Sequence, residues 1–133
     1  MQKEKDIDTL ARTIYGEARG ESKLGKMAVA SVILNRYKSG KWFAGKTIEE
    51  TCKKPWQFSC WNFNDVNRDK ILKATDEELG ECLTVARDAI NGAFGDVAMG
   101  SCHYHTKNCK PSWAVGKIPI TAVGNHLFYK DID

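Results

Sequence analysis

The least polar stretch of the chain is MAVASVIL at residues 27–34, inside a helical pattern that we place at residues 22–38. No side chain between Lys26 and Asn35 is charged. A helix that is apolar around its whole circumference has to be covered on every side. The stretch is also far shorter than the roughly 20 residues that span a bilayer. The sequence therefore predicts a helix buried at the centre of the fold, and no membrane insertion.

An amphipathic helix is predicted at residues 6–19, ending before Gly20. Its apolar or small side chains recur at helical spacing and form one face: Ile7, Leu10, Ala11, Ile14 and Ala18. Further helices are predicted from TIEE at 47–50 and TDEE at 75–78, because Thr-x-x-Glu has the spacing of a capping box. The helix after TDEE is expected to end near Asn91-Gly92. Its predicted apolar face comprises Leu79, Cys82, Leu83, Ala86, Ile90 and Ala93.

The two remaining long segments, residues 53–63 and 98–128, are rich in aromatic residues, Gly and Pro. They are predicted to form loops or short strands around a cleft. The fold class expected is mainly α, an α+β fold with a minor loop or β portion. At 133 residues the chain suits a single domain, residues 1–133, that buries roughly two thirds of its unfolded surface.

Charge and the N-terminal sequence limit the class of partner. The formal net charge is +3, and Lys and Arg are scattered rather than clustered, so the sequence indicates no nucleic-acid partner. The N-terminal segment MQKEKDIDTL is charged and lacks an apolar core, so no secretory signal peptide is predicted. We expect a monomer that is synthesised in the cytoplasm.

The five cysteines are odd in number and form no Cys-x-x-Cys pair: Cys52, Cys60, Cys82, Cys102 and Cys109. In a cytoplasmic protein most of them are expected to be reduced thiols, with Cys82 a small core residue. Disulfides stay open as an alternative if the protein works outside the cytoplasm.

The segment IYGEARGE at residues 14–21 contains the carboxylate of greatest interest. Glu17 follows Ile14 by three residues and Leu10 by seven, so it lies at the edge of the apolar face of the first helix. A carboxyl there is partly desolvated, which raises its pKa and suits a general acid near neutral pH. A small neighbour such as Gly16 lets another backbone or a ligand approach closely. Geometry alone favours the alternative of an ordinary cap or salt bridge at a helix end.

The segment PWQFSCWNF at residues 55–63 combines flat apolar side chains with amides and a hydroxyl, as a sugar-binding site requires. The aromatic members are Trp56, Phe58, Trp61 and Phe63, and the polar ones are Gln57, Ser59 and Asn62. The alternative that at least two of the aromatic side chains fill the core stays open.

The segment CHYHTKNC at residues 102–109 leaves two other kinds of site open. His and Cys are zinc ligands, but their spacing matches neither a zinc finger nor an HExxH protease, so no metal is predicted. Cys60 with a histidine base would make a cysteine peptidase or amidase. However, no helix N-terminus or cationic neighbour is predicted that would lower the pKa of Cys60. His103 is expected to face away from His105 on a short extended segment.

The segment ARTIYGEARGESKLGKMAVASVILNR at residues 11–36 resembles the signature of the SleB-like cell wall hydrolase family, which includes spore-cortex-lytic enzymes and many bacteriophage endolysins. Further blocks are similar and in the same order: PWQFSCWN at 55–62, HYHT with KPSW within 103–113, and GNHLFY at 124–129. The resemblance covers nearly the whole chain. It implies a lysozyme-like, mainly helical fold that acts on the glycan strand of peptidoglycan.

The resemblance also implies roles for individual residues. The catalytic glutamate of the family falls on Glu17, while Glu21 is expected to be structural. The residues implied to bind substrate or line the cleft are Gln57, Phe58, Ser59, Trp61, Tyr104, His105, Asn125 and His126. A structural role for His126 is an equal alternative.

A single strong carboxylate favours one reaction over others. Asp65, Asp69 and Asp76 have the polar surroundings of solvated helix starts, so none is expected to be a second catalytic acid. We therefore expect a lytic transglycosylase without a cofactor, in which Glu17 is acid and then base. The alternatives are a muramidase, a thiolate- or metal-dependent amidase or peptidase, and a non-catalytic wall-binding module. A phage endolysin is the expected setting, with a virion-associated or bacterial enzyme left open.

Overall fold

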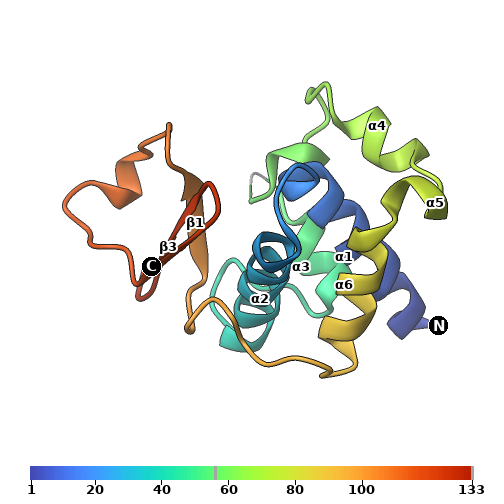
Figure 1. Ribbon diagram of the computed structural model, residues 1–133, viewed down its shortest axis with the longest axis horizontal. Helices are drawn as coiled ribbons and strands as arrows, with labels where there is room; N and C mark the ends of the chain where they lie inside the picture. Colours follow the sequence, from blue (N-terminus) through green and yellow to red (C-terminus); the bar gives the residue numbers. More distant parts are fainter. Residues whose placement is uncertain (56, 133) are drawn as a thin grey trace.

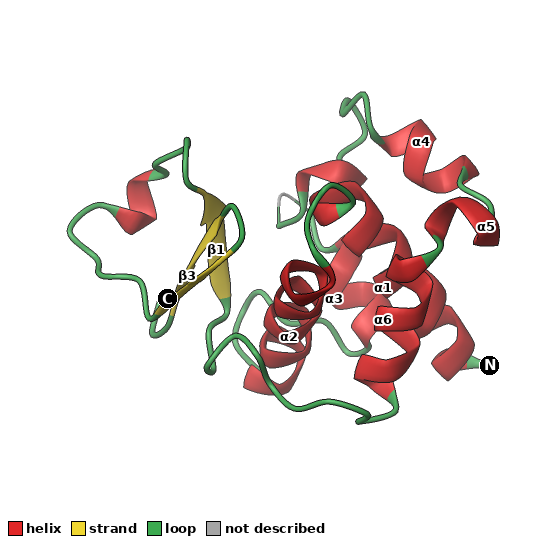
Figure 2. Ribbon diagram, in the orientation of Figure 1, coloured by secondary structure: helices red, strands yellow, loops and turns green. Residues whose placement is uncertain are grey.

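The computed structural model describes residues 1–55 and 57–132. Among these residues, six α-helices lie on one side and a three-stranded sheet on the other (Figures 1 and 2). The helices are α1 (Gln2–Ala18), α2 (Lys23–Ser39), α3 (Ile48–Lys53), α4 (Arg68–Lys73), α5 (Asp76–Leu79) and α6 (Glu81–Ile90), with 3-10 turns η1 (Ser59–Trp61) and η2 (Ser112–Ala114). The strands are β1 (His103–Thr106), β2 (Thr121–Val123) and β3 (His126–Tyr129). The mainly helical class with a minor β portion is confirmed.

Helix α2 is apolar all round because it lies between the other helices and the sheet (Figure 1). One side, with Val29 and Ile33, joins the main core formed with α1 and α6. The adjacent side, with Ala28 and Val32, packs against Phe128 of β3. The prediction of a buried central helix is confirmed. No helix in the described part of the chain is long and apolar enough to cross a membrane.

The first helix begins four residues earlier than predicted, and its predicted apolar face is buried around Leu10 and Ile14. The predicted helix after TDEE is instead interrupted at Gly80, with φ +47° and ψ −118°, a conformation that L side chains rarely adopt. Thr75 and Glu78 form the expected capping box, but it caps only the short α5. Ala93 lies beyond the end of α6 and is exposed.

Helix α4 was absent from the sequence-based prediction. Its six residues, RDKILK, are mostly charged, and only Ile71 is buried. A helix this short and polar has no apolar period to detect, so its existence depends on packing against α1 and η1.

The sheet is antiparallel with strand order β1-β3-β2. Tyr104 pairs with Phe128, and His105 pairs with Leu127. Because side chains alternate between faces, Tyr104 and Phe128 lie on the face toward α2, and His105 lies on the far face. The loops and short strands predicted in residues 98–128 are thereby confirmed.

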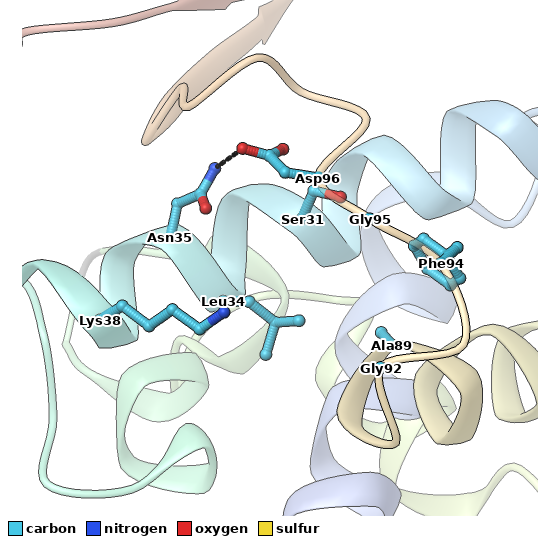
Figure 3. Close-up of a pocket in the computed structure, with 9 residues that line it drawn as sticks. All are labelled: Ser31, Leu34, Asn35, Lys38, Ala89, Gly92, Phe94, Gly95 and Asp96. Atoms are coloured by element: carbon cyan, nitrogen blue, oxygen red, sulfur yellow. Dashed lines mark hydrogen bonds between the residues drawn. The ribbon is translucent and has the colours of Figure 1, made fainter.

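The segment that leads into β1 is fixed to α2 by polar side chains (Figure 3). Asn35 of α2 donates to the Asp96 carboxylate over 3.1 Å and to the Ser101 carbonyl over 2.9 Å. Asp96 also accepts the backbone N–H groups of Ala98 and Gly100, at 2.8 and 2.7 Å. These bonds set where β1 starts and therefore where Tyr104 lies.

Candidate active site

Glu17 lies in the last turn of α1 and is reached there by residues from distant parts of the chain. The Tyr104 hydroxyl, from β1, donates a hydrogen bond to Glu17 Oε1 over 2.5 Å. The Cys60 thiol of η1 is a second hydrogen-bond partner of Glu17. Gly16 permits this approach, since a Cβ atom at Gly16 would lie 2.8 Å from the Cβ of Cys60. The glycine before Glu17 therefore lets η1 pack directly against the helix.

The surroundings of Glu17 favour the protonated form of its carboxyl group and raise its pKa. Burial is the largest cause and raises the pKa of the Glu17 carboxyl. The hydrogen bonds from Tyr104 and Cys60 and the positive charge of Arg36 act in the opposite direction, and the negative charge of Asp65 adds to the increase. A raised pKa is what a general acid needs near neutral pH.

Cys60 is poorly suited to be a nucleophile. Its thiol is buried, and burial together with the neighbouring Glu17 charge raises the pKa of Cys60, so the reactive thiolate is disfavoured. All five cysteines are free, and Cys82 is buried as predicted. Within residues 1–55 and 57–132, no group of three or more His, Cys, Asp or Glu side chains is arranged to hold a metal ion.

Arg36 is a buried cation that the sequence-based prediction missed. It comes from α2 and is only 5% exposed. Its guanidinium donates to the Cys102 carbonyl over 2.6 Å and to Gln57 Oε1 over 3.1 Å, and it lies over the Phe58 ring at 4.7 Å. The available signal was a charged residue two positions after the apolar run MAVASVIL, on a helix predicted to be buried. Arg36 therefore joins the segment around Gln57 to the start of β1.

A cavity of about 340 Å³ lies beside Tyr104. Its other described lining residues are Arg36, Trp42, Gln57, His103, Trp113 and Ile132. Trp42 is 63% exposed and presents a flat apolar face there. The cavity thus combines aromatic surface, an amide and a cation next to the residue that binds Glu17.

Glu21 anchors the turn between β2 and β3. Its Oε1 accepts the backbone N–H of Asn125 over 3.0 Å and lies 3.9 Å from His126 Nδ1. Gly124, at φ +57°, leaves no room for a side chain because a Cβ atom there would clash with Glu21 Oε1. The buried His126 ring in turn meets Tyr104 edge-on at 5.0 Å. Glu21 therefore supports the start of β3, the strand that pairs with β1 and packs His126 against Tyr104.

Comparison with known proteins identifies the family. The family model described as Cell Wall Hydrolase matches residues 20–129. The chain belongs to this family. The match begins after Glu17, so it does not bear on the role of that residue.

The curated relatives of this chain include spore cortex-lytic enzymes. The enzyme of Halalkalibacterium halodurans is 32% identical over 92% of this chain and 34% of its own length. That of Bacillus subtilis is 33% identical over 92% of this chain and 37% of its own length. The chain therefore spans well under half the length of these curated relatives.

Two solved structures are similar over nearly the whole chain. The catalytic domain of the Bacillus cereus SleB protein gives a TM-score of 0.77 at 30% identity, covering 96% of this chain and 91% of that one. The catalytic domain of the germination-specific lytic transglycosylase SleB from Bacillus anthracis gives 0.76 at 30% identity, covering 95% and 94%. The resemblance to SleB-like hydrolases is confirmed.

The structure separates the predicted site residues into groups. Tyr104 contacts Glu17, and Gln57 lines the cavity beside Tyr104. Ser59 is exposed next to Cys60, and Asn125 is exposed in the β2–β3 turn. Trp56 lies outside the described residues.

Three other residues that were predicted to bind substrate pack inside the fold. Phe58 is 2% exposed beneath Arg36. Trp61 packs on the main core, and its indole N–H donates to Thr13 Oγ1 over 2.8 Å. His126 is buried behind Tyr104. These positions match the alternatives of core filling and structural support that the sequence left open.

The expected orientation of the two strand histidines is wrong. His103 and His105 both contact Trp113, with ring centroids 5.2 and 5.7 Å apart. Residues two apart on a strand point to the same face, so they cannot lie on opposite sides. Tyr104, between them, faces Glu17 instead. His105 therefore lies on the face of the sheet away from Glu17.

The Tyr104–Glu17 hydrogen bond predicts a change in pH dependence. Tyr104→Phe removes a bond that stabilises the carboxylate, so the pKa of Glu17 rises further and the alkaline limb of the kcat/KM profile moves to higher pH. At the pH optimum kcat/KM should fall about tenfold, as expected for one lost hydrogen bond to a charged group. Tyr37→Phe, at a partly exposed tyrosine of α2, is the matched control. An alkaline limb that stays in place or moves to lower pH would contradict the assignment.

Proposed function

We propose that this cell wall hydrolase is a lytic transglycosylase that cleaves the β-1,4 bond between MurNAc and GlcNAc in the peptidoglycan glycan strand. The observation that carries the proposal is the desolvated Glu17 carboxyl, whose pKa is raised and whose Oε1 is held by Tyr104. The name of the similar Bacillus anthracis domain, a germination-specific lytic transglycosylase, supports the same reaction class.

The reaction needs only one carboxyl group from the protein. Protonated Glu17 donates its proton to the glycosidic oxygen as the bond from that oxygen to MurNAc C1 breaks. The Glu17 carboxylate then takes the proton of the MurNAc C6 hydroxyl while the C6 oxygen bonds to C1. The products are a 1,6-anhydro-MurNAc end and a free GlcNAc 4-hydroxyl, with Glu17 protonated again. Neither water nor a cofactor is consumed.

A muramidase is the second candidate, and the position of Asp65 favours it. Asp65 lies in the turn before α4, is only partly exposed, and is close enough for its charge to raise the pKa of Glu17. A second carboxylate near the acid is what a hydrolase acting through water requires. The two mechanisms differ in whether Asp65 is essential.

Mass spectrometry of the fragments released from purified peptidoglycan separates these reactions. A transglycosylase should yield 1,6-anhydro-MurNAc ends, and Asp65→Asn should leave the rate within about threefold of the parent. Reducing MurNAc ends, with a loss of roughly a hundredfold or more in Asp65→Asn, would instead establish the muramidase. Asp69→Asn, on the exposed side of α4, is the matched control.

The same digestion tests the more distant alternatives. Freed stem peptides would indicate an amidase or peptidase, against which the raised pKa of the buried Cys60 argues. Binding to cell walls without released fragments would indicate a non-catalytic module, a role for which the raised pKa of Glu17 serves no purpose.

We also propose the setting of a phage endolysin, acting as a monomer that is synthesised in the cytoplasm and then reaches the wall. The curated relatives are spore cortex-lytic enzymes, which makes the spore cortex the competing substrate. Digesting vegetative sacculi and isolated cortex side by side tests this, since an endolysin should release fragments from the vegetative wall at least as fast.

A further inference from the structure

The face of the sheet turned away from Glu17 carries its own cavity, of about 440 Å³. Its floor is formed by His105, Leu127 and Tyr129, which the strand register places on that far face. The loop of residues 107–119 forms its walls and contributes Ala114, itself buried, as apolar surface. This cavity shares no lining residue with the one beside Tyr104.

The charge around this cavity has one sign. Lys107, Lys110 and Lys117 line it, and all three are exposed. Residues 97–130 contain four lysines and no acidic residue, so this segment is more positive than the whole chain at +3. Across the described residues, none of the three lysines has a carboxylate within ion-pair distance.

The floor of this cavity is polar, and the two ring nitrogens of His105 both have hydrogen-bond partners. His105 Nδ1 lies 2.7 Å from the Thr106 carbonyl and therefore carries the proton. His105 Nε2 lies 2.9 Å from the Tyr129 hydroxyl and shares a hydrogen bond with it. Both ring nitrogens of His105 therefore have partners within the protein, and the lysines supply the fixed positive charge around the cavity.

We propose that this cavity binds the C-terminal carboxylate of a peptidoglycan stem peptide. The lysines supply the countercharge for the carboxylate, and the apolar surface of Leu127, Ala114 and Pro119 accepts the methyl group of a terminal alanine. Binding there gives the enzyme a second contact with peptidoglycan, on the opposite face of the sheet from Glu17. This inference rests on the proposed action on peptidoglycan.

The direct test uses N-acetyl-D-alanyl-D-alanine, which has a single carboxylate, and its C-terminal amide as the matched probe. The acid should shift the backbone amide NMR signals of residues 105–119 and 127–129, and binding should weaken with added salt. Lys107, Lys110 and Lys117 changed together to Gln should weaken it about tenfold, since each exposed charge contributes roughly a factor of two. Equal binding of acid and amide, or binding of glycerol phosphate but not of the acid, would overturn the proposal.

A variant with the same loss of charge controls for general electrostatics. Lys3, Lys5 and Lys73 are exposed on α1 and α4, at the end of the molecule away from the sheet (Figure 1), and their joint change to Gln should leave binding unchanged. An equal loss in this control would refute a specific site.

Cleavage assays separate this inference from the proposed function. The Lys107, Lys110 and Lys117 variant should have a raised KM on intact sacculi and an unchanged kcat/KM on glycan strands stripped of their peptides. If the glycan is not cleaved at all, the proposed function fails, while binding of the dipeptide still reports on the cavity. If cleavage is normal on both substrates in the variant, only the stem-peptide site fails.

Discussion

Glu17→Gln should abolish release of fragments from purified peptidoglycan, with a loss of roughly a thousandfold or more. Glutamine has nearly the shape of glutamate and still accepts the Tyr104 hydrogen bond, but it has no proton to give to the glycosidic oxygen. The measurement is chromatography and mass spectrometry of the released fragments. Circular dichroism and the melting temperature establish that the variant is folded.

Glu21→Gln is the matched control for this experiment. Glu21 belongs to the same segment, but it accepts the Asn125 N–H rather than lying at the Tyr104 hydroxyl. Its glutamine can accept the same bond, so most of the activity should remain. If Glu21→Gln were inactive while Glu17→Gln kept substantial activity, the assignment of the proton donor would be wrong.

Arg36→Met should lower the free energy of unfolding by about 2–4 kcal/mol. The change removes two hydrogen bonds from a buried guanidinium and leaves the Cys102 carbonyl and the Gln57 amide oxygen without that donor. It also removes the cation that stacks on Phe58. Urea denaturation of the parent and variant measures the difference, with the slope of the transition checked for two-state behaviour.

Arg87→Met provides the comparison for stability. Arg87 is exposed on α6, and a surface change of this kind should alter stability by no more than about 0.5 kcal/mol. Equal effects of the two substitutions would mean that Arg36 does not join the Gln57 segment to the start of β1. Arg36→Met also removes a charge that lowers the pKa of Glu17, so the alkaline limb of activity should move to higher pH in parallel.

Most of the helical body follows from the sequence. The apolar run of α2 and the apolar face of α1 are local periodic patterns, and the threonines before α3 and α5 satisfy nearby backbone N–H groups. These features depend on neighbours within a few residues. The break at Gly80 depends on a φ value that the sequence permits but does not require, and α4 has no apolar period.

The candidate site, too, was predictable from the sequence only in part. Its position on the edge of the α1 apolar face made Glu17 a candidate for a raised pKa, and Gly16 indicated a close neighbour. The identity of that neighbour, Cys60, and the buried cation Arg36 were not predictable, because both lie far from Glu17 in the chain. Their approach depends on how η1 and α2 pack against α1.

The sequence by itself therefore determined α1, α2, the start of α3, the central place of α2 and the acid on the edge of α1, since each is a local pattern of apolar and polar residues. Only the tertiary structure decided which side chains surround Glu17 and which face of β1 they occupy. Side chains on a strand alternate between its two faces, so a register shift of one residue would place His105 instead of Tyr104 beside Glu17. The packing of β1 and β3 on α2 selects Tyr104, and it turns His105 toward the lysine-lined cavity on the other face.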